Sequence, residues 1–516
     1  MRLARTLALL AALALAAPAA TRASDTQDST FQDDNHLVYA APDQVAATLD
    51  ELRSLGVDRI RVSLFWRLVA PAPDQALRPD FDDTNPAQYP PGAWDRYDTI
   101  VRDAAQRGIG VIFDVTGPAP DWATGTSPDR PDIKATYDPN PLYFDAFVRA
   151  AGTRYSGTYD PGGGALPRVS TWGIWNEPNQ AGWLTPQWAP APGGRQMIPA
   201  SPRIYRSLVG AAWDGLQSTG HGADTILIGE TAPKGLLNLT GETRSIDPVV
   251  FIEELYCLDR HLQLYAGQAA ADRGCPQSDQ VDQFAAQNPA LFNASGWAHH
   301  PYELIFSPGT PPRHRDRWIT TGNLGSLSRL LRRIRARYRQ PARPVPLWLT
   351  EFGYQTHPPD PLGVSFARQA VYLDQAEYIA WRNRNVQTLT QFLLYDDGPP
   401  YGLTFQSGLR TQDGTEKPSY AAYRLPLWLP RARVRRGTRM EVWGLVRPAP
   451  NGTAVRVAID VRRRGARRWH TLAEAMTDAQ RNYLDRRVRI TLRRGRYLLR
   501  LRWAGLASRS TPFTVR

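Results

Sequence analysis

The sequence predicts an α/β fold, a (β/α)8 TIM barrel, followed by a small all-β immunoglobulin-like sandwich. From about residue 30 to 425, short apolar runs alternate with amphipathic helical stretches, which is typical of a parallel sheet with crossover helices. After Pro430, apolar and polar residues alternate in short segments separated by Gly, Asn and Pro turns. We therefore expect the barrel over 30–428 and the sandwich over 432–516.

The first 23 residues have the features of a secretory signal peptide. Arg2 and Arg5 precede an apolar stretch from Leu7 to Ala20, and small residues follow it, as a cleavage site requires. The alternative is a membrane anchor, but the stretch is about 14 residues long, short of the roughly 20 that a span needs. We expect an exported protein, secreted or associated with the cell wall, without a membrane span.

Seven strand-like runs follow one another in the barrel segment, each rich in β-branched or aromatic residues. They lie at 59–65, 110–115, 169–175, 225–229, 296–300, 346–350 and 388–395. An eighth strand is needed to close the barrel. We expect it at Leu37 to Tyr39, where the pattern is weakest.

Amphipathic helices are expected between these runs. Apolar residues recur at helical spacing over 44–55 and 95–107, and Gly56 and Gly108 follow as C-cap residues. The alternative architecture is an open doubly wound sheet, but no glycine-rich fingerprint follows an early strand. The barrel is therefore favoured, and its active site is expected at the C-terminal ends of the strands.

Cys257 and Cys275 are the only cysteines, and both fall in a long insertion over 234–293. In an exported protein an even cysteine count favours a disulfide, and the alternative is two free buried thiols. Two cysteines and scattered histidines do not make a zinc site, so we expect no metal and no cofactor.

The basic charge of the chain belongs to its C-terminal part. Residues 431–516 hold 23 Arg against five Asp and Glu, a net charge of +18, whereas the whole chain carries +13. Residues 1–430 therefore sum to −5. Alternation along strands places the arginines on outward positions. They serve either as a solvated face or as a patch that binds an anionic cell-wall polymer, and no nucleic-acid partner is expected.

Two apolar runs end abruptly in a glutamate, at Glu177 and at Glu351. A carboxylate among tryptophans is costly to desolvate unless it is paired or used. Two such carboxylates on two barrel strands predict one site with two acids. Cleavage of a glycosidic bond with retention needs that pair, because one acid protonates the leaving oxygen and one carboxylate attacks the anomeric carbon.

The residues around these glutamates resemble motifs of clan A glycoside hydrolases, in particular families 5 and 39. Trp-Asn-Glu-Pro surrounds Glu177 and Thr-Glu-Phe-Gly surrounds Glu351, and the resemblance covers roughly residues 30–425. It implies that Glu177 is the acid/base and Glu351 the nucleophile. Residues 417–420, Lys-Pro-Ser-Tyr, look like the last helix of the clan.

The resemblance also implies supporting residues. Arg61 matches an arginine that supports the nucleophile, and His300 with Tyr302 matches a His-x-Tyr motif whose tyrosine hydrogen-bonds it. For each of the three, a purely structural role is the alternative. Asn176 is expected to hydrogen-bond the sugar 2-hydroxyl.

Further sugar contacts are expected from residues that follow the strand ends. Rings in these loops offer stacking platforms for sugars, and Trp122, Trp183 and Trp188 are the candidates. Tyr395 stands where many clan members carry a platform tryptophan, and it joins the substrate-binding candidates. Asp121, Asp396 and Glu230 are candidate hydroxyl-binding groups, whereas His299 points to the opposite face of its strand and is expected to be structural.

Together these features predict a secreted retaining β-glycosidase that hydrolyses O-glycosidic bonds of an oligo- or polysaccharide. Two alternatives belong to other classes: a non-catalytic glycan-binding protein on a glycosidase-like barrel, and a wall-associated adhesion protein that uses its basic module. The presence of both glutamates argues against the first alternative.

Overall fold

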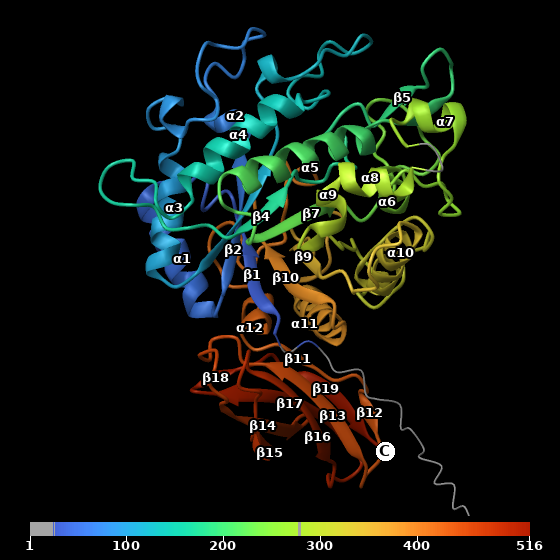
Figure 1. The fold of residues 1–516 in the computed structure, drawn as a ribbon. Helices are drawn as coiled ribbons and strands as arrows, with labels where there is room; N and C mark the ends of the chain where they lie inside the picture. The colour runs from blue at the N-terminus through green and yellow to red at the C-terminus, as the bar shows by residue number, and fades with distance from the viewer. Residues whose placement is uncertain (1–23, 25, 277–279) are drawn as a thin grey trace, which may run out of the picture.

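The structure, a computed structural model, describes residues 24, 26–276 and 280–516, so the expected signal peptide lies outside the described residues. Eight parallel strands close into a barrel in the order β1-β10-β9-β8-β7-β4-β3-β2 (Figure 1). The predicted barrel is confirmed. None of the described helices is long and apolar enough to cross a membrane.

The barrel strands alternate with helices along the chain. The strands are β1 (Asp28–Gln32), β2 (Arg59–Phe65), β3 (Gly110–Thr116), β4 (Thr171–Ile174), β7 (Thr225–Thr231), β8 (Gly296–His299), β9 (Leu347–Phe352) and β10 (Val386–Phe392). The helices are α1 (Pro42–Leu55), α2 (Trp66–Val69), α3 (Asp95–Gln106), α4 (Pro141–Arg154), α5 (Ser201–Ser218), α6 (Pro248–Leu255), α7 (Gly267–Asp272), α8 (Val281–Gln287), α9 (Pro289–Asn293), α10 (Leu324–Arg337), α11 (Phe366–Arg382) and α12 (Pro418–Arg424). A hairpin, β5 (Trp188–Pro190) and β6 (Met197–Pro199), follows β4.

The prediction of the closing strand was wrong. Leu37 to Tyr39 forms a turn, and the strand that pairs with β10 and β2 is β1, further upstream. Its sequence, Asp-Ser-Thr-Phe-Gln, has one apolar residue, so it does not look like a buried strand. Its polar side chains are nevertheless satisfied inside the barrel. Thr388 donates from Oγ1 to Thr30 Oγ1 (2.7 Å), and Gln32 accepts from Arg61 (2.6 Å).

The insertion between β7 and β8 folds into the four short helices α6 to α9. Cys257 and Cys275 form a disulfide there, with Cα atoms 5.6 Å apart. Leu255 and Glu254 at the end of α6 accept hydrogen bonds from Arg206 of α5 through their backbone carbonyls. The disulfide closes a loop within the insertion, whereas Arg206 attaches the insertion to α5 of the barrel.

The C-terminal residues form two sheets around a separate apolar core. One sheet has the order β11-β13-β16 and the other β12-β19-β17-β14-β15, with β18 against β17. The strands are β11 (Leu427–Trp428), β12 (Arg433–Val434), β13 (Arg439–Leu445), β14 (Arg456–Arg463), β15 (His470–Met476), β16 (Tyr483–Arg489), β17 (Gly495–Trp503), β18 (Leu506–Ala507) and β19 (Thr511–Val515). The short strand β11 pairs with β13, so Leu427 and Trp428 belong to the sandwich sheet rather than to the barrel.

The sandwich packs against α11 and the start of the barrel strands, as Figure 1 shows. Trp381 of α11 lies 5.8 Å from Trp443 of β13, measured between ring centroids. Arg447 reaches from the sandwich to Glu377 of α11 (2.5 Å), and Arg481 contacts Asp58, which precedes β2 (3.2 Å). The sandwich therefore covers the N-terminal end of the barrel, opposite the strand ends where an active site is expected.

Arg447 forms one of the buried ion pairs across this interface. Breaking a buried pair leaves an uncompensated charge and costs about 3–5 kcal/mol. We predict that Arg447→Met lowers the free energy of unfolding by about that amount, measured by urea denaturation followed through tryptophan fluorescence. The matched control is Arg456→Met, because Arg456 pairs with Glu474 on the surface (3.0 Å, both exposed) and should cost about 0–1 kcal/mol. Equal effects of the two variants would show that the Arg447 pair does not hold the sandwich in place.

Candidate active site

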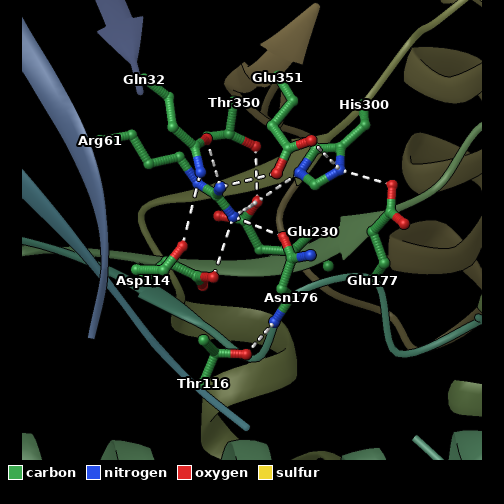
Figure 2. A network of polar contacts seen from close by, with 12 residues as sticks. Gln32, Arg61, Asp114, Thr116, Asn176, Glu177, Glu230, His300, Thr350 and Glu351 are labelled. Atoms are coloured by element: carbon green, nitrogen blue, oxygen red, sulfur yellow. Dashed lines mark hydrogen bonds and ion pairs between the residues drawn. The ribbon is translucent and has the colours of Figure 1, made fainter. Parts of the chain in front are cut away.

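Arg61 of β2 lies at the centre of a polar network at the C-terminal end of the barrel, and its side chain is fully buried (Figure 2). Its Nη1 donates to Glu351 (2.8 Å) and its Nη2 to Asn176 (2.8 Å). Nη2 also lies 3.2 Å from Glu230 and 3.0 Å from Asp114. One guanidinium thus fixes side chains from β3, β7, β9 and the chain just after β4, and three of them are carboxyl groups.

Glu351 lies near the end of β9, and every neighbour that contacts its oxygens is a hydrogen-bond donor. Oε1 accepts from Arg61, and Oε2 accepts from the hydroxyl of Tyr302 (3.0 Å). Burial raises the pKa of Glu351 and Glu177 adds to this, whereas His300, Arg61 and Tyr302 act in the opposite direction. The donors favour the ionised form, but burial outweighs them, so the pKa of Glu351 stays above its ordinary value.

Glu177 lies on the irregular chain that continues from β4. Trp175 and Glu177 have φ angles of 62° and 38°, and Glu230 across from them has 42°. Non-glycine residues in this left-handed region cost of the order of 1–3 kcal/mol each and gather at functional sites. The backbone N–H of Glu177 donates to the carbonyl of Glu230 (3.0 Å), which fixes both residues in these conformations.

His300 connects Glu177 to Glu230. Its Nδ1 lies 2.9 Å from Glu177 Oε1 and its Nε2 lies 2.9 Å from Glu230 Oε2. Burial lowers the pKa of His300, but Glu351 and the hydrogen bonds to Glu177 and Glu230 outweigh it and raise the pKa to about 10. At neutral pH the His300–Glu177 pair therefore holds a proton along the Nδ1 to Oε1 contact.

Glu230, at the end of β7, remains ionised beneath His300. Burial raises its pKa, but Arg61 and His300 act against this and bring the pKa to about 2. Thr350 donates a third hydrogen bond to the same oxygen (2.6 Å). Space for this carboxylate depends on Gly173 of β4, where a Cβ atom would lie 2.6 Å from Glu230 Oε1. The ionised Glu230 thus balances the positive charge of protonated His300.

The two glutamates that the sequence singles out are close together. Glu177, His300 and Glu351 each offer an atom within 4.8 Å of the other two. Among the described residues this is the group whose composition could also bind a metal ion. The hydrogen bonds of His300 to Glu177 and Glu230 already explain why these side chains lie close together. Carboxyl oxygens at most 4.8 Å apart are nearer to the roughly 5–5.5 Å separation of retaining glycosidases than to the roughly 6.5–9.5 Å of inverting ones.

A cavity of about 470 Å³ opens above these carboxyl groups. Asn176, Glu177, Glu351, Tyr302 and Trp183 of the expected site residues line it. Oδ1 of Asn176 accepts a hydrogen bond from Arg61, so the amide Nδ2 can donate a hydrogen bond into the cavity. Trp183 is half-buried and its ring lies parallel to Phe65, with centroids 6.4 Å apart.

Three expected aromatic platforms lie elsewhere. Trp122 packs against Trp66 and Tyr143 and donates to the carbonyl of Pro71 (3.0 Å). Trp188 donates to the carbonyl of Arg244 (2.8 Å). Tyr395 stacks on His36, with centroids 4.4 Å apart. None of the three lines the cavity, because each ring contacts a neighbouring segment of the chain instead.

Three other expected residues have structural partners. Asp121 pairs with Arg67 (2.8 Å), and Asp396 pairs with the buried ammonium of Lys417 (2.6 Å), so neither is a free hydroxyl-binding group. His299 bonds Thr231 and the carbonyl of Ile319, and burial lowers its pKa to about 3. His299 is structural, as expected.

Sequence reasoning missed the residues that β1 and β2 bring to the cavity. Gln32, Asp34 and Ser63 line it. Ser63 donates from Oγ to Asp34 (2.7 Å), and burial raises the pKa of Asp34. Gln32 ends the strand that the sequence did not reveal and Asp34 follows it, so a correct placement of β1 was the missing signal. Asp114, whose pKa burial raises to about 7, was hidden inside an apolar run.

Comparisons with known proteins give similarity in structure only. No protein-family model matches the chain, and no curated protein matches it. A family 39 glycoside hydrolase from the gut symbiont Bacteroides cellulosilyticus WH2 is similar, with 15% identity, 90% of this chain and 79% of that chain covered, and a TM-score of 0.46.

Two further solved structures are similar to the chain at the same level. One is GH5_18 from Streptomyces cattleya in complex with GlcNAc, with 17% identity, 80% of this chain and 84% of that chain covered, and a TM-score of 0.45. The other is a glucosidase from Croceicoccus marinus, with 12% identity, 90% and 94% covered, and a TM-score of 0.47. Scores below 0.5 carry no weight for function, which depends on the geometry of the site.

The contact between Glu230 and His300 makes a prediction about protonation. Removing the charge in Glu230→Gln takes away a partner of the imidazolium, so the pKa of His300 falls from about 10 toward its ordinary value of 6.5. Histidine ¹⁵N NMR across a pH series measures this midpoint, with His300→Gln to assign the signal. The matched control is Glu303→Gln, a buried acid that pairs with Lys234 instead (3.2 Å). An unchanged His300 midpoint in Glu230→Gln would contradict the role of this carboxylate.

Proposed function

We propose that this chain is a retaining β-glycosidase that hydrolyses O-glycosidic bonds, with Glu351 as nucleophile and Glu177 as acid/base. The observation that carries the proposal is the placement of two carboxyl groups within 4.8 Å of one another and of His300 at the base of one cavity. In a retaining site the nucleophile must reach the anomeric carbon while the acid reaches the leaving oxygen.

The contacts distinguish the roles of the two glutamates. Glu351 accepts from Arg61 and Tyr302, which stabilise the charge that an attacking carboxylate needs. Glu177 contacts the imidazole of His300, and its side chain is 19% exposed, against 10% for Glu351. A group that must exchange protons with a leaving alcohol and then with water benefits from that access.

The reaction proceeds in two displacements. Glu351 attacks the anomeric carbon, the bond to the leaving oxygen breaks, and that oxygen takes, through Glu177, the proton that Glu177 and His300 share. Glu177, now ionised, then removes a proton from water, and the water oxygen displaces Glu351 from the sugar. Glu230 and His300 support both steps, because His300 shares the proton of Glu177 and Glu230 compensates the charge of the imidazolium.

We also propose that the protein is exported and attaches to an anionic wall polymer through its sandwich. Arg439 lies directly opposite Arg489 in the β13–β16 pair, and Arg436 bonds the terminal Arg516 through the backbone. All four side chains are exposed, and none has an ion-pair partner among the described residues. Like charges opposite one another are destabilising unless an anion binds between them. We call these four residues the arginine edge.

The alternative, a non-catalytic glycan-binding protein, differs in one measurable way. Such a protein needs neither a proton donor nor a nucleophile, whereas the proposal requires both.

Substitution of the two glutamates separates the two steps. Glu351→Ala should abolish turnover of every β-glycoside. Glu177→Ala should still release dinitrophenol from dinitrophenyl glycosides, because that leaving group needs no proton. Initial rates on a panel of dinitrophenyl and alkyl β-glycosides measure the difference. Loss of activity on all substrates in both variants, or wild-type rates in either, would reject these roles.

The arginine edge predicts salt-dependent binding. Exposed charges interact over about 8–10 Å at ordinary salt, so co-sedimentation with purified anionic wall should fall steeply toward ~0.5 M salt. Replacing Arg436, Arg439, Arg489 and Arg516 by Gln should reduce binding at low salt. The matched control replaces four exposed arginines of α10, which are Arg329, Arg332, Arg333 and Arg337. Equal loss in both variants would mean that net charge and not this edge binds the wall.

A further inference from the structure

The cavity above the glutamates has two unlike walls. Strands β1 and β2 and the chain just after β1 and β4 contribute mostly polar side chains, among them Gln32, Asp34, Ser63 and Asn176. The end of β10 and the loops after β8, β9 and β10 contribute Leu304, Ile305, Leu362, Phe392 and Phe405, which we call the apolar wall.

The apolar wall is unusual in its exposure. Leu304, Ile305, Leu362 and Phe405 are 57%, 48%, 73% and 47% exposed. Seven of the fourteen exposed large apolar side chains of the described chain belong to the three loops that form this wall, with Phe306, Tyr401 and Leu403 beside the cavity residues. Single exposed apolar residues are common on proteins, but a contiguous group at a cavity marks a binding site.

The apolar wall begins at the reacting groups. Tyr302, which holds Glu351, meets Phe392 edge to face, with centroids 6.4 Å apart. Phe392 meets Phe405 in the same manner at 5.3 Å. On the side of the acid, Leu304 and Ile305 follow shortly after His300, the partner of Glu177. A group that leaves beside Glu177 therefore enters a cavity that Leu304 and Ile305 also line.

The polar groups on this side already have partners. Glu303 pairs with Lys234 (3.2 Å) and accepts from the backbone of Leu304 (3.0 Å). Ser407 donates to the carbonyl of Phe392 (2.9 Å). An extended glycan on this wall would leave the hydroxyl groups that face Leu304, Ile305 and Leu362 without hydrogen bonds.

We propose that the substrate is a glycoside with an apolar aglycone, an alkyl-type hydrocarbon group, rather than a polysaccharide. The sugar binds the polar wall, where Asn176, Asp34 and Ser63 meet its hydroxyl groups, and the hydrocarbon lies along the apolar wall. This substrate class rests on the proposed glycosidase function. It replaces the glycan polymer that the sequence favoured.

The test is the dependence of binding on alkyl chain length. n-Alkyl β-D-glucosides from methyl to octyl, below their micelle concentrations, are titrated calorimetrically into the full chain carrying Glu351→Gln, which prevents turnover. Each methylene that the wall buries should tighten binding by up to about fourfold. The slope with chain length is the readout, so it does not depend on whether glucose is the natural sugar.

Two variants show whether the slope belongs to this wall. Leu304→Asn with Leu362→Asn, both well exposed, should flatten the slope. The control Leu77→Asn removes a leucine that is 82% exposed outside the cavity, and it should leave the slope unchanged. A Kd that is constant along the alkyl series, or a slope that survives in the double variant, would overturn the proposal. So would affinity that rises instead with the number of glucose units from cellobiose to cellotetraose.

Turnover is measured separately with the wild-type chain. Release of dinitrophenol from dinitrophenyl β-glycosides, together with a flat alkyl series, would keep the glycosidase function and reject the apolar aglycone. A steep series without any turnover would reject the glycosidase and keep an apolar ligand on this wall.

Discussion

The buried guanidinium of Arg61 is the interaction on which the site depends. It contacts Glu351, Glu230 and Asp114 with no solvent exposure of its side chain, and the carboxyl groups raise its pKa although burial lowers it. Three carboxyl groups around one cation cannot all ionise cheaply, and the pKa of Asp114 is raised to about 7 while that of Glu230 falls to about 2. This difference between the pKa values of Asp114 and Glu230 decides where protons lie in the site.

The low pKa of Glu230 also explains why His300 carries a positive charge in the barrel interior. Glu230 stays ionised next to Arg61, and it in turn stabilises a proton on His300. Glu177 therefore has a proton partner, while Glu351 has only donors. The two ends of the barrel also differ in the side chains that they hold. Reaction groups gather at the carboxyl ends of the strands, and the basic sandwich packs at the other end through buried ion pairs such as Arg447 with Glu377.

The sequence could predict the barrel and the position of both glutamates, because an apolar strand that ends in a carboxylate is a strong physical signal. It could not predict β1, whose polar side chains are paired inside the barrel, and so Gln32 and Asp34 were missed. Trp122 and Tyr395 were misplaced for a different reason. Proximity to a strand end in sequence does not fix the direction of a ring, and these rings turn toward Tyr143 and His36. Leu304 and Leu362 gave no signal at all, since loop leucines become a wall only when the fold brings three loops together.

The central claim is that Glu351 and Glu177, with carboxyl oxygens at most 4.8 Å apart, act as nucleophile and acid/base. The most direct measurement is proton NMR of the sugar released from an aryl β-glycoside, recorded before the anomers equilibrate. Two displacements at the anomeric carbon restore its configuration, so the β anomer should form first. An α anomer as first product would contradict it, because inversion leaves no role for Glu351 as a nucleophile.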